Sequence, residues 1–183
     1  MKGSLPMEGI LRPVSLPPEL TPLKKVRTLT RAGLAVLMLM EIPAGSLPER
    51  SGEKIVVDVS NHWARKEIIQ VVRLGWMSAQ AGHRFQPDLP VTRGDAAGIF
   101  DALLEQGGVE ASPLPESGRG PLDLPKGHLL YPVVRRLLAM GIMDLDGAGN
   151  FNPEEKLSGS EARAILRKIR ILLIAGPGVG KLP

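Results

Sequence analysis

Apolar residues recur at helical spacing in two neighbouring stretches near the middle of the chain. The first stretch, within residues 62–76, has apolar side chains at Ile68, Val71 and Val72. The second has them at Ala97, Phe100, Leu103 and Leu104. This spacing predicts two short amphipathic helices, the first of which ends at Gly75. Gly82 and the turn Phe85-Gln86-Pro87 separate the helices, and the ring of Phe85 is expected to fill the core.

Each second helix is expected to begin at a hydroxyl residue that caps it. Thr92 precedes the stretch around Phe100, and its hydroxyl can accept a hydrogen bond from an early main-chain N–H. Asp95, three residues later, completes the pattern of a capping box. Ser158 and Glu161 repeat this pair further along the chain. Thr30 keeps only the cap, because a glycine stands at the position of the acid.

The sequence repeats itself around these elements. Residues 75–95 read GWMSAQAGHRFQPDLPVTRGD, and residues 141–161 read GIMDLDGAGNFNPEEKLSGSE. A shift of 66 positions (141 minus 75) aligns the two without a gap and superposes a Gly, a Met, a Phe and a Pro. His62 matches His128 in the same register. Self-similarity of this kind indicates repeated units that bury their apolar faces against one another.

A third, partial copy precedes these two. Leu29-Thr30-Arg31-Ala32 matches Val91-Thr92-Arg93-Gly94, and both lead into an apolar helical stretch. Residues 13–28 lack the Gly and Phe-x-Pro landmarks, so the first repeat lacks its front half. The predicted organisation is an N-terminal segment with partial repeat one over 1–45 (second helix 29–42), repeat two over 53–106, a linker over 107–120, repeat three over 121–175, and a flexible tail over 176–183.

Composition and charge exclude several classes of protein. The chain is 43% apolar but only 3% aromatic, so aliphatic side chains must form most of the core. It has no cysteine, which excludes disulfides, thiolate metal sites and cysteine nucleophiles. The net charge of +4 comes without a dense basic stripe between aromatics, so we expect no nucleic-acid partner. The longest apolar runs, 35–40 and 171–175, are far shorter than the ~20 residues of a membrane span. Residues 1–22 hold too many prolines for a signal peptide.

Three patterns suggest site chemistry, and each fails at particular residues. Residues 144–155 have the spacing of a calcium loop, but Ala148 takes a ligand position. The C-terminal ILLIAGPGVGKLP resembles a phosphate-binding loop without its hydroxyl residue or the helix that should follow. His62 and His128 occupy equivalent repeat positions, which favours packing or capping, and no catalytic constellation includes them. We therefore expect no metal, no cofactor and no catalytic residue.

The recurring residues resemble the repeat of the S-layer homology family. Val57-Asp58-Val59, His62-Trp63-Ala64, Phe85-x-Pro87 and Val91-Thr92-Arg93-x-Asp95 stand in that family's order, from an Asp-Val and His-Trp-Ala block to a Thr-Arg-Ala-Glu block. The resemblance implies an all-α fold of three helix-loop-helix repeats in a pseudo-threefold bundle. It also implies a location at the cell envelope or cell surface. The implied partner is a cell-wall polysaccharide, often pyruvylated, or a peptidoglycan-associated polymer.

In that family the ligand grooves lie between neighbouring repeats. The resemblance implies five ligand-binding residues here: Arg93, Arg31, Asp58, Trp63 and Asp123. A guanidinium can make paired hydrogen bonds to a ketal carboxylate, and an aspartate can accept them from sugar hydroxyls. An indole can pack on a sugar face. The arginine and the tryptophan also have a purely structural interpretation. In it, Arg93 bridges to a carboxylate of another repeat and Trp63 belongs to the core.

Departures from the family pattern leave two classes of function open. Repeat three has Gly159 where the arginine belongs and Leu129 where the tryptophan belongs. One interpretation is a non-catalytic module that anchors a protein to wall polysaccharide. The other is a protein–protein interaction scaffold, whose degenerate repeats keep the fold without binding glycan.

Overall fold

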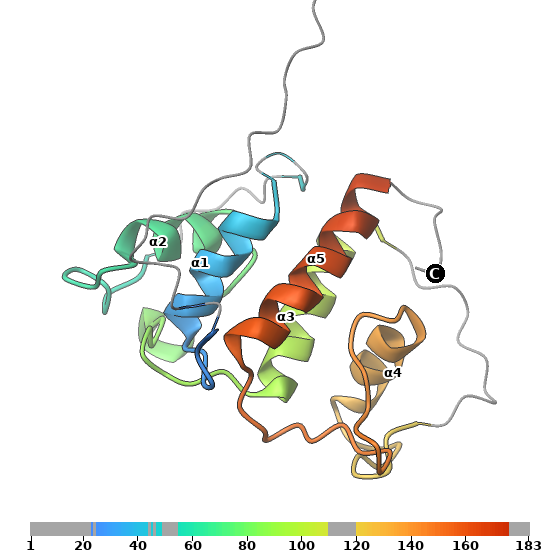
Figure 1. Cartoon of the computed structure of the whole chain (residues 1–183). Coiled ribbons are helices and arrows are strands. Elements are labelled where there is room, and N and C mark those ends of the chain that lie inside the picture. The colour runs from blue at the N-terminus through green and yellow to red at the C-terminus, as the bar shows by residue number, and fades with distance from the viewer. Residues whose placement is uncertain are drawn as a thin grey trace, which may run out of the picture.

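The computed structural model describes residues 25–43, 55–109 and 120–175, together with Leu23, Gly45, Leu47 and Pro48. Residues 1–22, most of the predicted linker and the predicted tail lie outside this part. The described residues form five α-helices and short 3₁₀ segments, and they contain isolated β-bridges but no strand (Figure 1). The elements are α1 (Arg31–Glu41), α2 (Arg65–Arg73), η2 (Ala81–His83), α3 (Arg93–Gln106), α4 (Tyr131–Ala139) and α5 (Gly159–Ala175). The predicted all-α class is confirmed.

Helices α1, α3 and α5 begin at the predicted caps. The Thr92 hydroxyl accepts from the Asp95 N–H at 3.0 Å, and the Asp95 carboxylate accepts from the Thr92 N–H at 3.0 Å, which completes a capping box. Thr30 caps α1 by accepting from an N–H in its first turn at 3.2 Å. Ser158 accepts from the Glu161 N–H at 3.2 Å. The second half of the box predicted for α5 is replaced by another contact, because Glu161 pairs with an arginine of α3.

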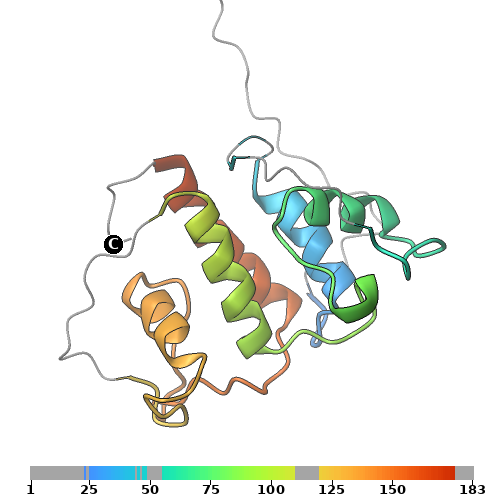
Figure 2. The same cartoon turned by 180° about the vertical axis from the view of Figure 1, so that it is seen from behind.

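The short helices pack across repeat boundaries. Helix α2, the first helix of repeat two, packs against α1 of repeat one. Helix α4, the first helix of repeat three, packs against α3 of repeat two. Helix α5 contacts both α1 and α3, and the views from the front and from behind show it between them (Figures 1 and 2). Each front half thus covers the second helix of the repeat before it.

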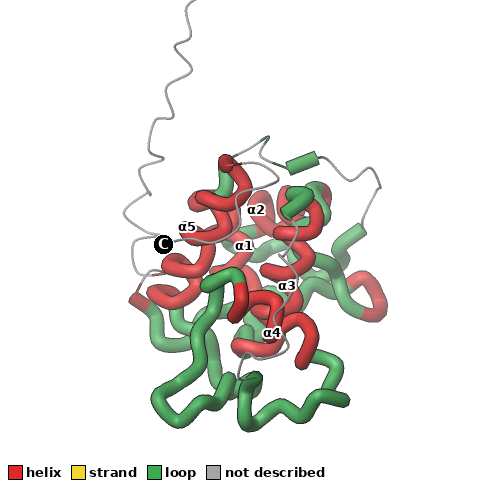
Figure 3. Tube along the Cα trace, turned by 90° about the vertical axis from the view of Figure 1, so that its right-hand side faces the viewer, coloured by secondary structure: helices red, strands yellow, loops and turns green. Residues whose placement is uncertain are grey.

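The core is aliphatic apart from a few rings. Phe85, Phe100 and Phe151 are fully buried, and Phe85 fills the core as predicted. Burial of one such side chain stabilises the fold by roughly 1.5–3 kcal/mol. In the side view the helices gather on one side of the molecule and long loops on the other (Figure 3). No helix in the described ranges has the length and apolar character that crossing a membrane requires.

Main-chain hydrogen bonds join the three repeats in a closed ring. The Leu29 N–H donates to the Leu157 oxygen at 2.8 Å, the Leu157 N–H to the Val91 oxygen at 2.9 Å, and the Val91 N–H to the Leu29 oxygen at 2.9 Å. Each of these residues directly precedes a helix cap. The ring supports the predicted pseudo-threefold packing, which remains a prediction.

Candidate functional site

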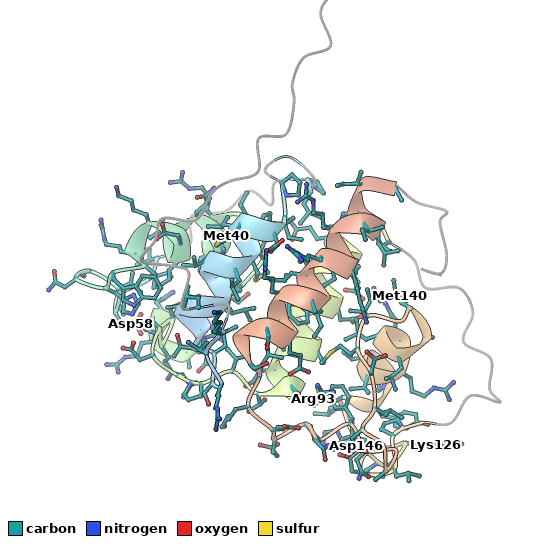
Figure 4. The ribbon with its side chains drawn as sticks, in the orientation of Figure 1. Met40, Asp58, Arg93, Lys126, Met140 and Asp146 are labelled. Carbon is teal, nitrogen blue, oxygen red and sulfur yellow. The ribbon has the colours of Figure 1, made fainter. Side chains whose placement is uncertain are left out.

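Arg93, at the start of α3, reaches into the loop of the following repeat. Its Nε donates to the main-chain oxygen of Phe151 at 2.8 Å, and its Nη2 to that of Asp144 at 2.8 Å. Its Nη1 pairs with the carboxylate of Glu161. The guanidinium carbon lies 4.9 Å from the centroid of the Phe151 ring, within cation–π range. Arg93 is labelled in Figure 4. All three guanidinium nitrogens therefore have partners inside the protein.

Arg31, at the start of α1, makes the equivalent contacts to repeat two. Its Nε donates to the Phe85 oxygen at 2.7 Å and its Nη2 to the Ser78 oxygen at 2.8 Å, with the Phe85 centroid 4.8 Å away. Asp95 takes the sequence position of Glu161, but its shorter side chain stays in the capping box of α3. Burial lowers the pKa of Arg31, against the attraction of Asp95 and Asp58. Within the described residues, no acceptor lies on its Nη1.

Asp58 holds the Phe-x-Pro turn of its own repeat. Its two carboxylate oxygens accept from the N–H groups of Phe85 and Gln86, each at 2.8 Å. Gln86 has a φ of 55°, a left-handed conformation that is unfavourable for a residue with a side chain. Burial raises the pKa of Asp58, but these hydrogen bonds and the charge of Arg84 outweigh it, so the pKa lies below its usual range. The carboxylate stabilises a turn that would otherwise be strained.

Asp123 repeats this clamp in repeat three. Its oxygens accept from the N–H groups of Phe151 and Asn152, each at 2.7 Å, and Asn152 has a φ of 56°. Together with Arg93, it holds Phe151 from both sides of its main chain. The four charged residues that the resemblance nominated thus converge on two equivalent turns, one in each complete repeat.

Trp63 differs from these four residues because its side chain is open to solvent. The side chain is 57% exposed, so the interpretation of Trp63 as a core residue is wrong. Its ring lies 5.4 Å from the ring of His62, centroid to centroid, with 37° between the planes. Nδ1 of His62 accepts from the Ala64 N–H at 3.1 Å, just before α2, and Nε2 lies 3.3 Å from an oxygen of Asp88.

Comparison with known proteins identifies the repeats. Residues 57–97 and 123–162 match the family model described as the S-layer homology domain. Each of the two complete repeats is therefore similar to an S-layer homology repeat. The first match begins one residue before the turn-holding Asp58 and the second at the turn-holding Asp123, and they end near the starts of α3 and α5. These repeats associate the chain with the bacterial cell wall or cell surface.

One curated relative has a name that refers to the cell wall. It is a Bacillus anthracis protein described as an uncharacterized cell wall amidase, 26% identical to this chain over 135 residues. The alignment covers 74% of this chain and 23% of that protein. The chain therefore spans about a quarter of the relative's length.

The third S-layer homology repeat lacks the arginine for a visible reason. A side chain at Gly159 would collide with the main chain of Leu23, and the Gly159 N–H donates to the Val26 oxygen at 2.9 Å. The segment that leads into α1 therefore occupies the space into which Arg31 and Arg93 reach at the other two boundaries. Leu129, at the position of Trp63, is 91% exposed.

The pair of Arg93 with Glu161 agrees with the interpretation in which Arg93 bridges to a carboxylate of another repeat. Other charged pairs between helices were not foreseen from the sequence. Glu41 of α1 is buried and receives Arg163 and Arg167 of α5, with Nε–oxygen distances of 2.6 and 3.4 Å. Arg136 of α4 lies 3.1 Å from an oxygen of Asp101, without the angle of a hydrogen bond. No local pattern signals these pairs, because only the packing of the helices brings their residues together.

The loop with calcium-like spacing holds itself closed. One carboxylate oxygen of Asp146, which is labelled in Figure 4, accepts from the N–H groups of Ala148 and Asn150. The other oxygen accepts from the side-chain amide of Asn152. These hydrogen bonds, the one from Asn150 foremost, lower the pKa of Asp146. Across the described ranges, no group of three or more His, Asp or Glu side chains is arranged to hold a metal.

Proposed function

We propose that this chain is a non-catalytic anchoring module that binds a cell-wall polysaccharide at the boundary between repeats one and two. The observation that carries the proposal is the exposed indole of Trp63, held beside that boundary. Indole rings combine a large apolar face with a polar edge, which suits them to sugar rings. The polymer is expected to bear carboxylates, as a pyruvylated polysaccharide does.

Contacts around Trp63 place it near the start of α1. His62, on which the indole leans, lies 3.3 Å from Asp88. The main-chain oxygens on either side of Asp88 accept from the N–H groups of Arg31 and Ala32, at 2.9 Å each. Trp63 and the first turn of α1 are thus separated by a single loop. A polysaccharide on the indole would pass close to Arg31.

Arg31 is the arginine that we propose for the carboxylate. Its Nη1 has no acceptor among the described residues, whereas Nη1 of Arg93 is taken by Glu161. An Arg–carboxylate hydrogen bond is charge-assisted and about twice as strong as a neutral one. For Arg93, Asp58 and Asp123 we propose a share in binding through the turns that they hold. The amidase chemistry named for the relative is not part of this proposal.

A protein–protein scaffold is the second candidate. It is favoured by two exposed leucines of repeat three, Leu129, at the position of Trp63, and Leu122, at the position of Val57. Exposed apolar side chains that gather at one place mark protein interaction surfaces. The two candidates differ in which repeat makes the contact.

Sedimentation with purified bacterial wall sacculi tests the proposal. The sacculi are used intact, after acid treatment that cleaves pyruvyl ketals, and after extraction of the polysaccharide. We expect the chain to co-sediment with intact sacculi, and Trp63→Ala to weaken binding at least about tenfold without changing stability. Leu129→Ala, the matched change in repeat three, should leave binding unchanged. Failure of the unaltered chain to sediment, or full binding by Trp63→Ala, would overturn the proposal.

A further inference from the structure

His62 stands at the centre of the short turn that leads into α2. Its N–H donates to the Val59 oxygen at 3.1 Å, and its own oxygen accepts from the Arg65 N–H at 3.0 Å. Trp63 and Ala64 are the two residues between His62 and Arg65. The main chain is thus held on both sides of His62, and the 57% exposed Trp63 lies in the second half of the turn.

The imidazole ring of His62 closes this turn. Nδ1 lies 3.1 Å from the Ala64 nitrogen and accepts its hydrogen bond. Because Ala64 is fully buried, water is not at hand as a substitute acceptor. The side chain of His62 is 11% exposed, and its ring centroid lies 5.4 Å from that of Trp63. One ring therefore both holds the main chain around Trp63 and contacts the indole.

These contacts require one protonation state of the ring. A ring nitrogen that accepts a hydrogen bond carries no proton, so the hydrogen bond from Ala64 needs an unprotonated Nδ1. In the neutral ring the proton is then on Nε2, which lies 3.3 Å from an oxygen of Asp88 and can donate to it. In the doubly protonated ring both nitrogens are donors, so Nδ1 would face the Ala64 N–H with a hydrogen of its own. Protonation of His62 therefore breaks the contact that closes the turn.

We propose that His62 is a positioning residue for Trp63, and that it holds the indole in place only as the neutral ring with its proton on Nε2. Protonation of His62 opens the turn and releases the indole. Histidine is the side chain that ordinarily changes charge between about pH 5 and 8. Wall binding should therefore weaken as the pH falls through this range, a consequence that rests on the proposed role of Trp63 in polysaccharide binding.

The charges around the ring do not compensate for the lost hydrogen bond. In the described part of the chain, Asp88 is the charged side chain within ion-pair distance of His62, and it is 86% exposed. Exposed ion pairs contribute little, because water screens them. Nε2 can donate to Asp88 in both protonation states, so protonation adds no hydrogen bond there. The other charged or titratable groups nearby are either at least partly open to solvent or engaged with main-chain groups between α2 and α3: Arg65, Lys66, Glu67, His83 and Arg84 in the first case, Arg31 and Asp58 in the second.

Repeat three contains the same turn without an indole. Nδ1 of His128 accepts from the Leu130 N–H at 3.1 Å. The His128 N–H and oxygen also make the main-chain hydrogen bonds that His62 makes, 66 residues earlier. Leu129 takes the place of Trp63. A substitution at His128 therefore disturbs an equivalent turn and leaves the indole untouched.

Nuclear magnetic resonance on the intact chain tests the positioning role without any polysaccharide. The chain has two tryptophans, and the indole signal that disappears in Trp63→Phe identifies the exposed ring. At about pH 7.5 we expect slow relaxation typical of an ordered indole, and nitrogen shifts of His62 that place its proton on Nε2. At about pH 5.5 the indole should become mobile, and the Ala64 amide should lose protection from hydrogen exchange.

Two substitutions at His62 separate the acceptor from the ring. His62→Phe keeps a ring beside Trp63 but removes the acceptor, so the indole should be mobile at both pH values. His62→Asn restores an acceptor that does not titrate, because an asparagine side chain can accept from the N–H two residues on. Its indole should stay ordered at both pH values. His128→Phe, the matched change in repeat three, should leave the indole as it is in the unaltered chain.

Three results would overturn the positioning role of His62. One is a proton on Nδ1 at the higher pH. Another is an indole that is equally ordered in His62→Phe and in the unaltered chain. The third is an indole that loses its order at the lower pH in His62→Asn as it does in the unaltered chain, because that variant has no titrating ring.

Sedimentation with intact sacculi at the same two pH values tests the consequence for binding. The unaltered chain should lose several-fold more affinity on acidification than His62→Asn, and this comparison cancels any titration of the wall itself. Equal losses for the two proteins would contradict the link between His62 and wall binding. A chain that does not sediment at either pH would instead refute the proposed function, while the relaxation of the indole would still decide the role of His62.

Discussion

Nε of Arg93 lies 2.8 Å from the main-chain oxygen of Phe151, which is 58 residues further along the chain. Arg31 and Phe85 stand in the same relationship at 2.7 Å across the preceding boundary. In both cases the guanidinium also lies over the ring of the same phenylalanine. One arginine thus satisfies the main chain of a buried turn and covers the side chain that plugs the core. The two arginines tie consecutive repeats together.

Replacing Arg93 by alanine should destabilise the protein strongly. Arg93→Ala removes two hydrogen bonds to main-chain oxygens and leaves Glu161 without its partner, so we expect a loss of about 3 kcal/mol in the free energy of unfolding. Arg93→Lys should recover less than half of this, because one ammonium cannot reproduce the planar donor set. Urea denaturation measures both.

The control for Arg93 is Arg73→Ala, which removes an exposed arginine from the end of α2. It should change the free energy of unfolding by less than about 0.5 kcal/mol. Similar losses for the two variants would mean that Arg93 contributes only its charge, and that the contacts to Phe151 are without energetic weight.

Local patterns in the sequence predicted the elements of this fold. The Thr92 cap, the helix around Phe100 and the burial of Phe85 all follow from spacing within about fifteen residues, which the sequence displays directly. The repeat then extended these predictions to Phe151 and α5. Helix bounds differed by a few residues at the ends, where capping and packing decide them.

The partners of the charged residues could not be predicted in the same way. Family resemblance nominated Arg93 and Asp58 for ligand contact, and the structure shows both engaged with main-chain groups of a turn. Those contacts depend on which repeat packs on which, and a linear pattern does not contain that information. Gly159 is a different case. The sequence showed that it departs from the family pattern, and the structure shows why: the main chain of Leu23 lies against it.

Restoring the family's arginine at position 159 should therefore harm the fold. Gly159→Arg, and even Gly159→Ala, would drive a side chain into the main chain of Leu23. Because a main-chain segment cannot swing aside as a side chain can, we expect a loss of about 2–3 kcal/mol for Gly159→Ala. Thermal unfolding followed by circular dichroism measures it.

Gly98→Ala provides the matched comparison. Gly98 lies on the exposed side of α3, and a methyl group there would meet no atom within 4 Å. Alanine favours helix over glycine by about 0.5–1 kcal/mol, so this variant should unfold at a higher temperature than the unaltered chain. If both alanine variants were stabilising, the close approach of Leu23 to α5 would be disproved.

Stability should depend on pH through Asp58. The pKa of Asp58 in the folded state lies below the usual value. The stability that its carboxylate contributes to the fold is therefore present above the unfolded-state pKa of about 3.9, and it is lost as the pH falls toward the folded-state pKa. Asp58→Asn keeps one acceptor and loses the charge, so we expect it to cost about 1–2 kcal/mol at pH 6. That deficit should shrink as the pH falls below 4. Urea denaturation at a series of pH values would show this.

Asp101 should give the opposite trend. Burial raises its pKa, against the attraction of Arg136. The stability that protonated Asp101 contributes to the fold is fully present below its unfolded-state pKa. It is lost as the pH rises through its folded-state pKa. Relative to the unaltered chain, Asp101→Asn should therefore gain stability with rising pH, whereas Asp58→Asn loses it. If the stability of both variants, relative to the unaltered chain, changed with pH in the same direction, the environments assigned to Asp58 and Asp101 would be wrong.

The three helix caps should differ in strength. Thr92 takes part in a reciprocal pair with Asp95, while Thr30 and Ser158 each accept from one main-chain N–H. Thr92→Ala removes the oxygen that accepts from Asp95 and frees the carboxylate that holds the start of α3, so we expect it to cost about 1.5–2 kcal/mol. Thr30→Ala and Ser158→Ala should each cost about 0.5–1 kcal/mol. The same ranking should appear in hydrogen exchange, with the Asp95 amide losing more protection than the equivalent amides of α1 and α5. An equal cost for all three would mean that the carboxylate of Asp95 adds nothing to the cap.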